Sequence, residues 1–130
     1  MHELPESLEI LAHELATRDY AFADSPAPAS TQDAALRLVN GDMSVRLTRT
    51  GGAWFIDLSC RAWGGGWHDA ALVRAAFEHA PLSVEVPLAE QATWVLSNLE
   101  GRLSDPSRAS RVAAQLNRLT DLDAHHKFGV

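Results

Sequence analysis

Apolar and polar residues alternate in three short stretches in the first half of the chain. The alternating apolar positions are Leu36 and Leu38, then Met43, Val45 and Leu47, then Trp54, Ile56 and Leu58. A period of two places such side chains on one face of a β-strand, and that face is expected to be buried. Asn40-Gly41 and Gly51-Gly52 separate the stretches and suit hairpin turns. The pattern therefore predicts a three-strand antiparallel meander within residues 36–69.

Apolar residues recur every three or four positions in much of the remaining chain, which is the spacing of amphipathic helices. Pro5 precedes the first of these stretches, Asp69 is a suitable N-cap for the second, and Pro87 suits the first turn of the third. Asp105-Pro106 marks the start of a last one. The predicted helices cover residues 5–17, 69–79, 87–103 and a segment that follows Asp105.

Shorter segments complete the expected architecture. Residues 24–30 are rich in proline and alanine and are expected to form a loop. Residues 82–86 alternate briefly and predict either a fourth strand or an extended connector. Residues 20–22 are expected to pack on the core. The polar tail 121–130 is expected to fray. The elements predict a single α+β domain over residues 1–130, with an N-terminal helix, an antiparallel sheet of three to four strands, and two to three C-terminal helices on one sheet face.

The formal net charge of −6 is confined to the start of the chain. Residues 1–33 contain seven acidic residues and a single basic one, Arg18, whereas the other 97 residues contain ten of each. An acidic N-terminal segment on an otherwise electrically neutral chain disfavours nucleic-acid binding, because that binding requires a basic surface. It is typical either of a protein that binds a basic protein partner or of a solvated helix face.

Composition also limits the location and the chemistry. No apolar run approaches the ~20 residues that span a bilayer, and the acidic N-terminus lacks the features of a secretory signal. Cys60 is the only cysteine, so neither an internal disulfide nor a cysteine-built zinc site is expected. The sequence therefore predicts a cytoplasmic protein that binds no membrane, no metal and no cofactor.

The segment Trp63-Gly64-Gly65-Gly66-Trp67 is the most unusual in the chain. Tryptophans offer large, stiff contact area of the kind found at binding hot spots, and glycines permit close backbone approach. The alternative is that both rings pack at the edge of the core while the glycines merely turn the chain. The sequence leaves both interpretations open.

The sheet face opposite the helices is also expected to remain partly exposed. Its residues are Arg37, Arg46, Thr48, Phe55, Asp57 and Ser59. We predict that a protein partner contacts the acidic first helix, the tryptophan segment and this sheet face, because arginine and aromatic side chains are enriched where proteins bind each other. The residues predicted to make these contacts are Glu6, Glu9, Glu14, Asp57, Trp63, Trp67 and His68.

Catalytic chemistry has one candidate pair. Cys60 and His68 would make a thiol nucleophile and its base, provided that they lie within hydrogen-bond reach. The strand alternation instead places Cys60 on the buried face, which favours a structural thiol. The histidines and aspartates of residues 121–126 do not have the spacing of a zinc signature. No catalytic and no metal-binding residue is predicted.

Several short segments of the chain are similar to segments of a known class of proteins. These segments are Leu38-Val39-Asn40-Gly41-Asp42, Val45-Arg46-Leu47-Thr48-Arg49, Gly52-Ala53-Trp54-Phe55-Ile56-Asp57-Leu58, Trp67-His68-Asp69, Leu72-Val73-Arg74-Ala75 and Leu88-Ala89-Glu90-Gln91-Ala92. Over residues 36–103 the chain resembles small bacterial immunity proteins of polymorphic toxin systems. The resemblance implies an intracellular protein that binds and blocks a cognate toxin and has no catalysis of its own. It assigns no binding residue.

The leading hypothesis is therefore a non-enzymatic immunity protein that occludes a basic toxin domain. In size and acidity the chain is also similar to type III secretion chaperones, so a secretion or assembly chaperone is the alternative, and it predicts a homodimer. A small hydrolase that uses Cys60 and His68 is the third hypothesis.

Overall fold

The computed structural model describes residues 4–23, 32–64, 66–78, 86–99, 103, 111–116 and 118. The elements in chain order are α1 (Glu6–Thr17), β1 (Ala21–Ala23), β2 (Gln32–Asn40), β3 (Met43–Thr50), β4 (Ala53–Cys60), the 3-10 helix η1 (Arg61–Trp63), β5 (His68–Asp69), α2 (Ala70–Glu78) and α3 (Leu88–Asn98). Residues 111–116 are also helical. The loop 24–30 and the tail 121–130 lie outside the described residues.

The five strands form one sheet in sequence order, and each strand is antiparallel to the next. Asn40 pairs with Met43 and Thr50 pairs with Ala53, so two-residue turns close both central hairpins. Gly41 has a φ of 59°, a value that glycine adopts without strain. The predicted meander is confirmed, and its turns set the register of β2, β3 and β4.

The predicted α+β class is confirmed, while the sheet has more strands than expected. The two additional strands, β1 and β5, contain three and two residues and are too short to show an alternating pattern. They are strands because their backbones pair with the outer edges of β2 and β4 in the folded protein. Residues 82–85 of the expected fourth strand fall outside the described part of the chain, and Val86 is not in a strand.

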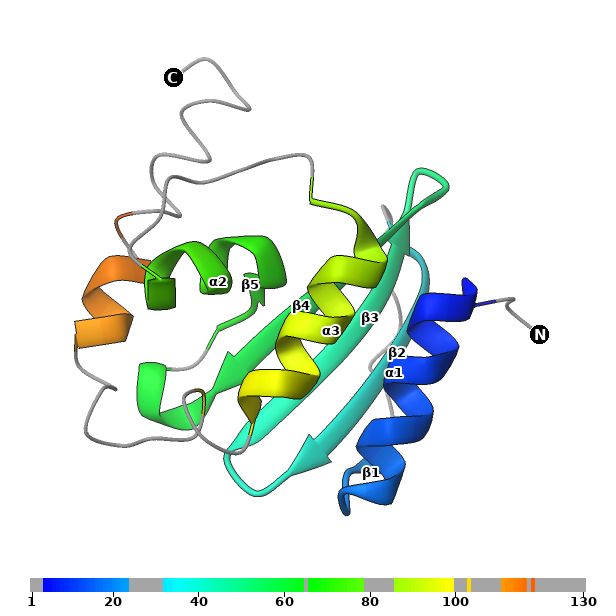
Figure 1. The fold of residues 1–130 in the computed structure, drawn as a ribbon, viewed down its shortest axis with the longest axis horizontal. Coiled ribbons are helices and arrows are strands. Elements are labelled where there is room, and N and C mark those ends of the chain that lie inside the picture. Colours follow the sequence, from blue (N-terminus) through cyan, green and yellow to red (C-terminus); the bar gives the residue numbers. More distant parts are fainter. Residues whose placement is uncertain are drawn as a thin grey trace.

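The helices pack on one face of the sheet. In Figure 1, α1 and α3 lie side by side over the strands, and α2 packs beside α3 toward β5. Between the layers lies a core of fully buried side chains, each of which contributes about 1.5 to 3 kcal/mol by leaving water. The core residues with no exposed surface are Leu8, Leu11, Leu15, Leu38, Val45, Leu47, Ile56, Leu58, Val73, Val95 and Leu116.

The C-terminal end of α1 and the start of α2 follow from local hydrogen bonds. At the end of α1, the Asp19 N–H bonds the Ala16 carbonyl (3.3 Å) and the Tyr20 N–H bonds the Leu15 carbonyl (3.0 Å). This pair of bonds is a Schellman motif, and it requires the left-handed backbone that Asp19 adopts (φ 67°). At the start of α2, the predicted cap Asp69 accepts the Ala71 N–H at 2.9 Å.

Candidate functional site

Trp63 lies in the core, although the sequence predicts that it contacts a partner. It is 5% exposed. Its ring centroid lies 6.0 Å from that of Phe77 and 6.5 Å from that of His68. Gly64 follows with a φ of 90° and turns the chain away from the buried ring. For Trp63 the structure therefore matches the alternative interpretation, a ring that packs at the edge of the core, and we exclude Trp63 from the candidate surface.

Trp67 lies on the opposite side of the sheet from Trp63. The guanidinium carbon of Arg46 sits 4.4 Å from the centroid of the Trp67 ring, which is a cation–π contact. Arg46 alternates with the buried residues Val45 and Leu47, so its side chain lies on the face away from the helices. Trp67 is half-buried there.

The same sheet face carries a charged cluster. The Asp57 carboxylate oxygen Oδ2 accepts hydrogen bonds from Arg46 Nη2 at 3.1 Å, from Arg46 Nε at 3.3 Å and from Thr48 Oγ1 at 3.3 Å. Arg37 stands directly across from Arg46 on β2. Of the residues expected to be partly exposed here, Phe55 is 40% exposed but Thr48 is only 3% exposed. The Asp57 carboxylate is therefore already paired within the protein, and this lowers its capacity to bind a charged partner.

Cys60 and His68 do not form an accessible catalytic pair. Cys60 is 5% exposed and lies opposite Met43, so its thiol faces the core. His68 lies opposite Leu58 and is half-buried beside Trp63. A thiol that substrate cannot reach does not act as a nucleophile. The described residues also contain no group of three metal-binding side chains, and residues 121–126 lie outside them.

The outward face of α1 is acidic. Glu6 and Glu9 are exposed, and Glu14 is half-buried. Ile10 lies among them and is 53% exposed, although it is large and apolar. None of the ion pairs found among the described residues involves Glu6 or Glu9. This face therefore combines negative charge with an exposed apolar side chain, Ile10, which no pattern in the sequence indicates.

Arg18, the only basic residue of the first 33, is directed at another helix. Its Nη1 donates a hydrogen bond of 2.7 Å to the carbonyl oxygen of Leu96, in the last turn of α3. Free carbonyls at a helix C-terminus attract positive charge, so this is a favourable place for a guanidinium. The Arg18 carbonyl in turn accepts a bond of 3.2 Å from Asn40 Nδ2. The guanidinium of Arg18 is therefore directed at the C-terminal end of α3.

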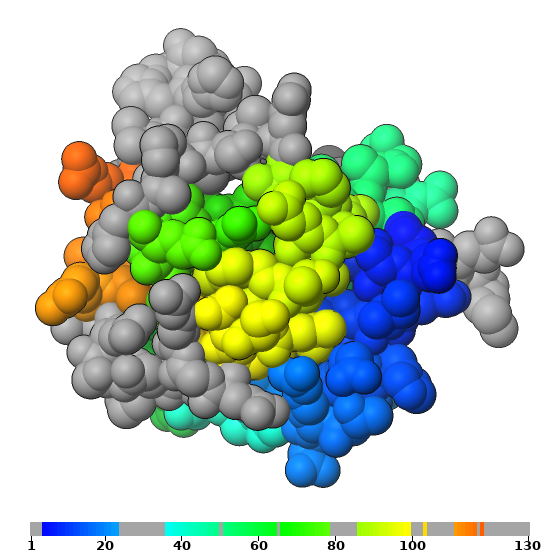
Figure 2. Space-filling view, in the orientation of Figure 1, coloured from blue at the N-terminus to red at the C-terminus, as the bar shows by residue number. Residues whose placement is uncertain are grey.

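The predicted contact residues thus belong to two separate surfaces. Glu6, Glu9 and Glu14 lie on the helical layer, which Figure 2 shows with α1 next to α3. Asp57 and Trp67 lie on the other sheet face. A single flat partner surface cannot cover both sets at once, because the sheet separates them. The predicted site must therefore be divided, and we name its α1 part the acidic surface, defined by Glu6, Glu9, Ile10 and Glu14.

Residues 20–22 are predicted to pack on the core, and the two aromatic residues among them differ in this respect. Tyr20 is half-buried and packs against the core. Phe22 is 61% exposed on β1, although its cross-strand neighbour Leu38 is fully buried. Tyr20 precedes β1 and Phe22 lies within it, and a three-residue strand is too short for a sequence pattern to separate the two aromatic residues.

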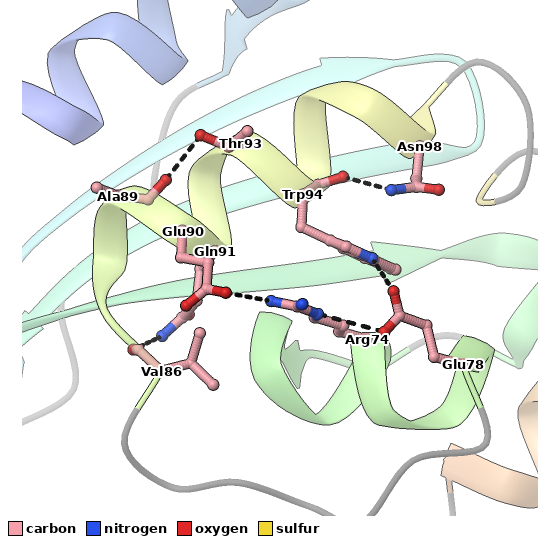
Figure 3. A network of polar contacts seen from close by, with 9 residues as sticks. All are labelled: Arg74, Glu78, Val86, Ala89, Glu90, Gln91, Thr93, Trp94 and Asn98. Atoms are coloured by element: carbon pink, nitrogen blue, oxygen red, sulfur yellow. Dashed lines mark hydrogen bonds and ion pairs between the residues drawn. The ribbon is translucent and has the colours of Figure 1, made fainter.

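A polar network joins α2 to α3, and no sequence motif indicates it (Figure 3). Arg74 forms ion pairs of 3.4 Å with Glu78 and with Glu90. Glu78 also accepts the indole N–H of Trp94 at 2.9 Å. The ring of Trp94 is 8% exposed. These contacts hold two helices together, and their charges are used within the protein.

Comparisons with protein families, with curated proteins and with solved structures return no match to this chain. None of the helices in the described part of the chain has the length and apolar content that crossing a bilayer needs.

Proposed function

We propose that this protein is a non-enzymatic inhibitor that binds another protein, and that it acts in the cytoplasm as an immunity protein against a cognate bacterial toxin. The observation that carries the proposal is the acidic surface on α1. Glu6 and Glu9 are exposed around Ile10, and the nearby Arg18 is held against α3. Burial of Cys60 favours a binding function over thiol catalysis.

The acidic surface suits a basic toxin domain for two physical reasons. Complementary charge raises the rate of association, and the steering weakens as salt shortens the Debye length to about 8 Å at 0.15 M. An apolar side chain at the centre of a charged patch supplies the desolvated contact that slows dissociation. Ile10 occupies this central position between Glu6, Glu9 and Glu14 along the helix.

The sheet face that carries Asp57 and Trp67 is the weaker candidate for the same function. Asp57 already accepts three hydrogen bonds, and the Trp67 ring already stacks on Arg46. A partner that bound there would have to replace contacts that the folded protein makes for itself.

The test is neutralisation of a toxin encoded beside this gene, measured as growth of cells that express the toxin. The double variant Glu6→Gln/Glu9→Gln removes two negative charges from the acidic surface. The control Thr93→Lys/Ser97→Lys changes the net charge by the same amount at two exposed positions of α3. We expect the first variant to slow association with the toxin roughly three- to tenfold at low salt, and the control to slow it less.

Two results would contradict the proposal. One is full toxicity in cells that contain the unmodified protein. The other is an equal loss of association rate in both double variants, because that would show an effect of net charge without a local surface. Folding of each variant is checked by its thermal unfolding midpoint, which these exposed substitutions are expected to leave nearly unchanged.

A further inference from the structure

The last helical segment of the described chain, residues 111–116 with Arg118, has a basic outward face. Arg111 and Arg118 are exposed, and so is Ala114, which lies between them. No acidic residue occurs within residues 111–118. None of the ion pairs found among the described residues involves either arginine. We name Arg111, Ala114 and Arg118 the basic surface.

The basic surface has the same layout as the acidic surface of α1, with the opposite charge. Glu6 and Glu14 are eight residues apart on α1, which is about 12 Å along the helix, and Ile10 lies midway between them. Arg111 and Arg118 are seven residues apart, which is about 10 Å at the same rise per residue. Each surface is therefore a stripe of two like charges with an uncharged residue at its centre, and the two spacings differ by only about 2 Å.

The two surfaces lie at opposite ends of the molecule. In Figure 1, α1 and the helical residues 111–116 are at the two ends of the longest axis, with α2 and α3 between them. Figure 2 shows the same separation on the outside of the molecule, with α1 in blue and residues 111–116 in orange. The two stripes therefore cannot meet within one copy of the chain, and a contact between them joins two copies.

The charge distribution favours a second copy of this chain as the occupant. The net charge of −6 arises within residues 1–33, while the remaining residues are neutral in sum. A head-to-tail arrangement brings the basic surface of one copy to α1 of the next, and it leaves a whole molecule between the two α1 helices. At 0.15 M salt the Debye length is about 8 Å, so the distant acidic helices are screened from each other, whereas opposite charges in contact attract.

We propose that copies of this chain associate head to tail, with the acidic surface of one copy on the basic surface of the next. Ile10 packs on Ala114, and the two glutamates of one stripe pair with the two arginines of the other. This contact leaves one unused surface at each end, so pairs and then longer chains form as the concentration rises. Two exposed ion pairs and one apolar side chain hold it weakly, with a Kd of about 0.1 to 1 mM. The contact covers the surface that the proposed function assigns to the toxin, so on that function self-association and toxin binding exclude each other.

The test is the translational diffusion coefficient of the full chain, measured by NMR at 0.15 M salt. For the unmodified chain it should fall by roughly a quarter between about 0.05 and 1 mM protein. The variant Glu6→Lys/Glu14→Lys makes both surfaces basic, and Arg111→Glu/Arg118→Glu makes both surfaces acidic. Each variant alone should stay monomeric, because like charges then face each other between copies.

An equimolar mixture of the two variants separates recognition between the surfaces from an effect of net charge. Opposite charges face each other again between unlike chains, so the mixture should regain the association of the unmodified chain. The two variants carry net charges of −2 and −10, so attraction between whole molecules cannot cause this recovery. A third variant, Ile10→Ala, changes a 53% exposed side chain, leaves both charge stripes in place and should raise the Kd about threefold. Thermal unfolding verifies that each variant is folded.

Three outcomes would overturn the inference. A diffusion coefficient of the unmodified chain that changes no more than those of the reversed variants would show that the copies stay apart. A mixture of the two folded variants that stays monomeric would show that the surfaces do not recognise each other. Where a reversed variant does not fold, unchanged association of Ile10→Ala is the third such outcome. None of these measurements uses a toxin, so failure here is separate from failure of the neutralisation test.

Discussion

Replacement of Asp57 by alanine should destabilise the protein measurably, because one carboxylate oxygen holds three donors. Arg46 donates twice to Oδ2 and Thr48 donates once, at 3.1 to 3.3 Å. The side chains of Arg46 and Asp57 are 25% and 16% exposed, and Thr48 is 3% exposed. The substitution therefore leaves a buried hydroxyl and a half-buried guanidinium without their acceptor.

The expected loss of stability is the sum of the contributions of these two groups. A buried hydroxyl that loses a long hydrogen bond costs about 1 kcal/mol. The ion pair is partly exposed, so its loss costs about 1 kcal/mol, well below the figure for a fully buried pair. Arg37 stands opposite Arg46, so removal of Asp57 also leaves two neighbouring arginines with less negative charge near them. We expect a loss of about 2 kcal/mol, which corresponds to a fall in Tm of roughly 8 °C for a chain of this size.

The assay is urea denaturation followed by circular dichroism, with a double-mutant cycle that combines Asp57→Ala and Arg46→Met. Methionine keeps an apolar stem and removes the guanidinium. The coupling free energy between the two positions should be about 1 kcal/mol. The intermediate variant Asp57→Asn keeps a neutral acceptor and should lose about half as much stability as Asp57→Ala. A loss below about 0.5 kcal/mol for Asp57→Ala, or no coupling in the cycle, would refute this account of the cluster.

Further substitutions test other parts of the structure. Asp19→Gly should stabilise the protein by about 0.5 to 1 kcal/mol in urea denaturation, because Asp19 has a φ of 67° that glycine adopts more easily. Gly64→Ala should cost about 1 to 2 kcal/mol by the same measurement; its φ is 90° and no atom lies within 4 Å of the added carbon, so the cost is backbone strain alone. Trp94→Phe should cost about 1 to 2 kcal/mol because it removes the 2.9 Å bond to Glu78, and a larger loss for Glu78→Gln, which keeps an acceptor, would contradict this. Cys60→Ser should lower stability by about 1 to 2 kcal/mol while toxin neutralisation persists; loss of neutralisation in a folded variant would favour a catalytic thiol.

Much of the fold can be predicted from the sequence because the periodicity of apolar residues and the positions of turn and cap residues indicate the same elements. Alternation defines β3 and β4 and the second half of β2, and the glycines between these strands adopt the left-handed angles that two-residue turns need. The leucines of α1 have helical spacing, and all three that face the sheet are fully buried. Asp69 was predicted as a helix cap and makes the expected bond. These features depend on interactions between residues that are close in the chain.

The candidate site could be predicted less well from the sequence, because it depends on which face of the sheet each side chain occupies. Trp63 and Trp67 flank the same glycines, yet Trp63 packs on Phe77 in the core while Trp67 stacks on Arg46 across the sheet. The left-handed turn at Gly64 and the pairing of His68 with Leu58 decide this difference. Neither is visible in a local pattern, since a three-residue or two-residue element has no measurable period.

The sequence by itself determined the α+β class, the central hairpins, the limits of α1 and the concentration of negative charge in the first quarter of the chain. Only the tertiary structure decided that Arg18 turns to the end of α3, that Ile10 and Phe22 stay exposed, and that Asp57 is already paired. The physical reason is the range of the interactions. Turn geometry and helical spacing are set within a few residues, whereas exposure and pairing depend on residues that are distant in the chain and meet only when the sheet and helices pack.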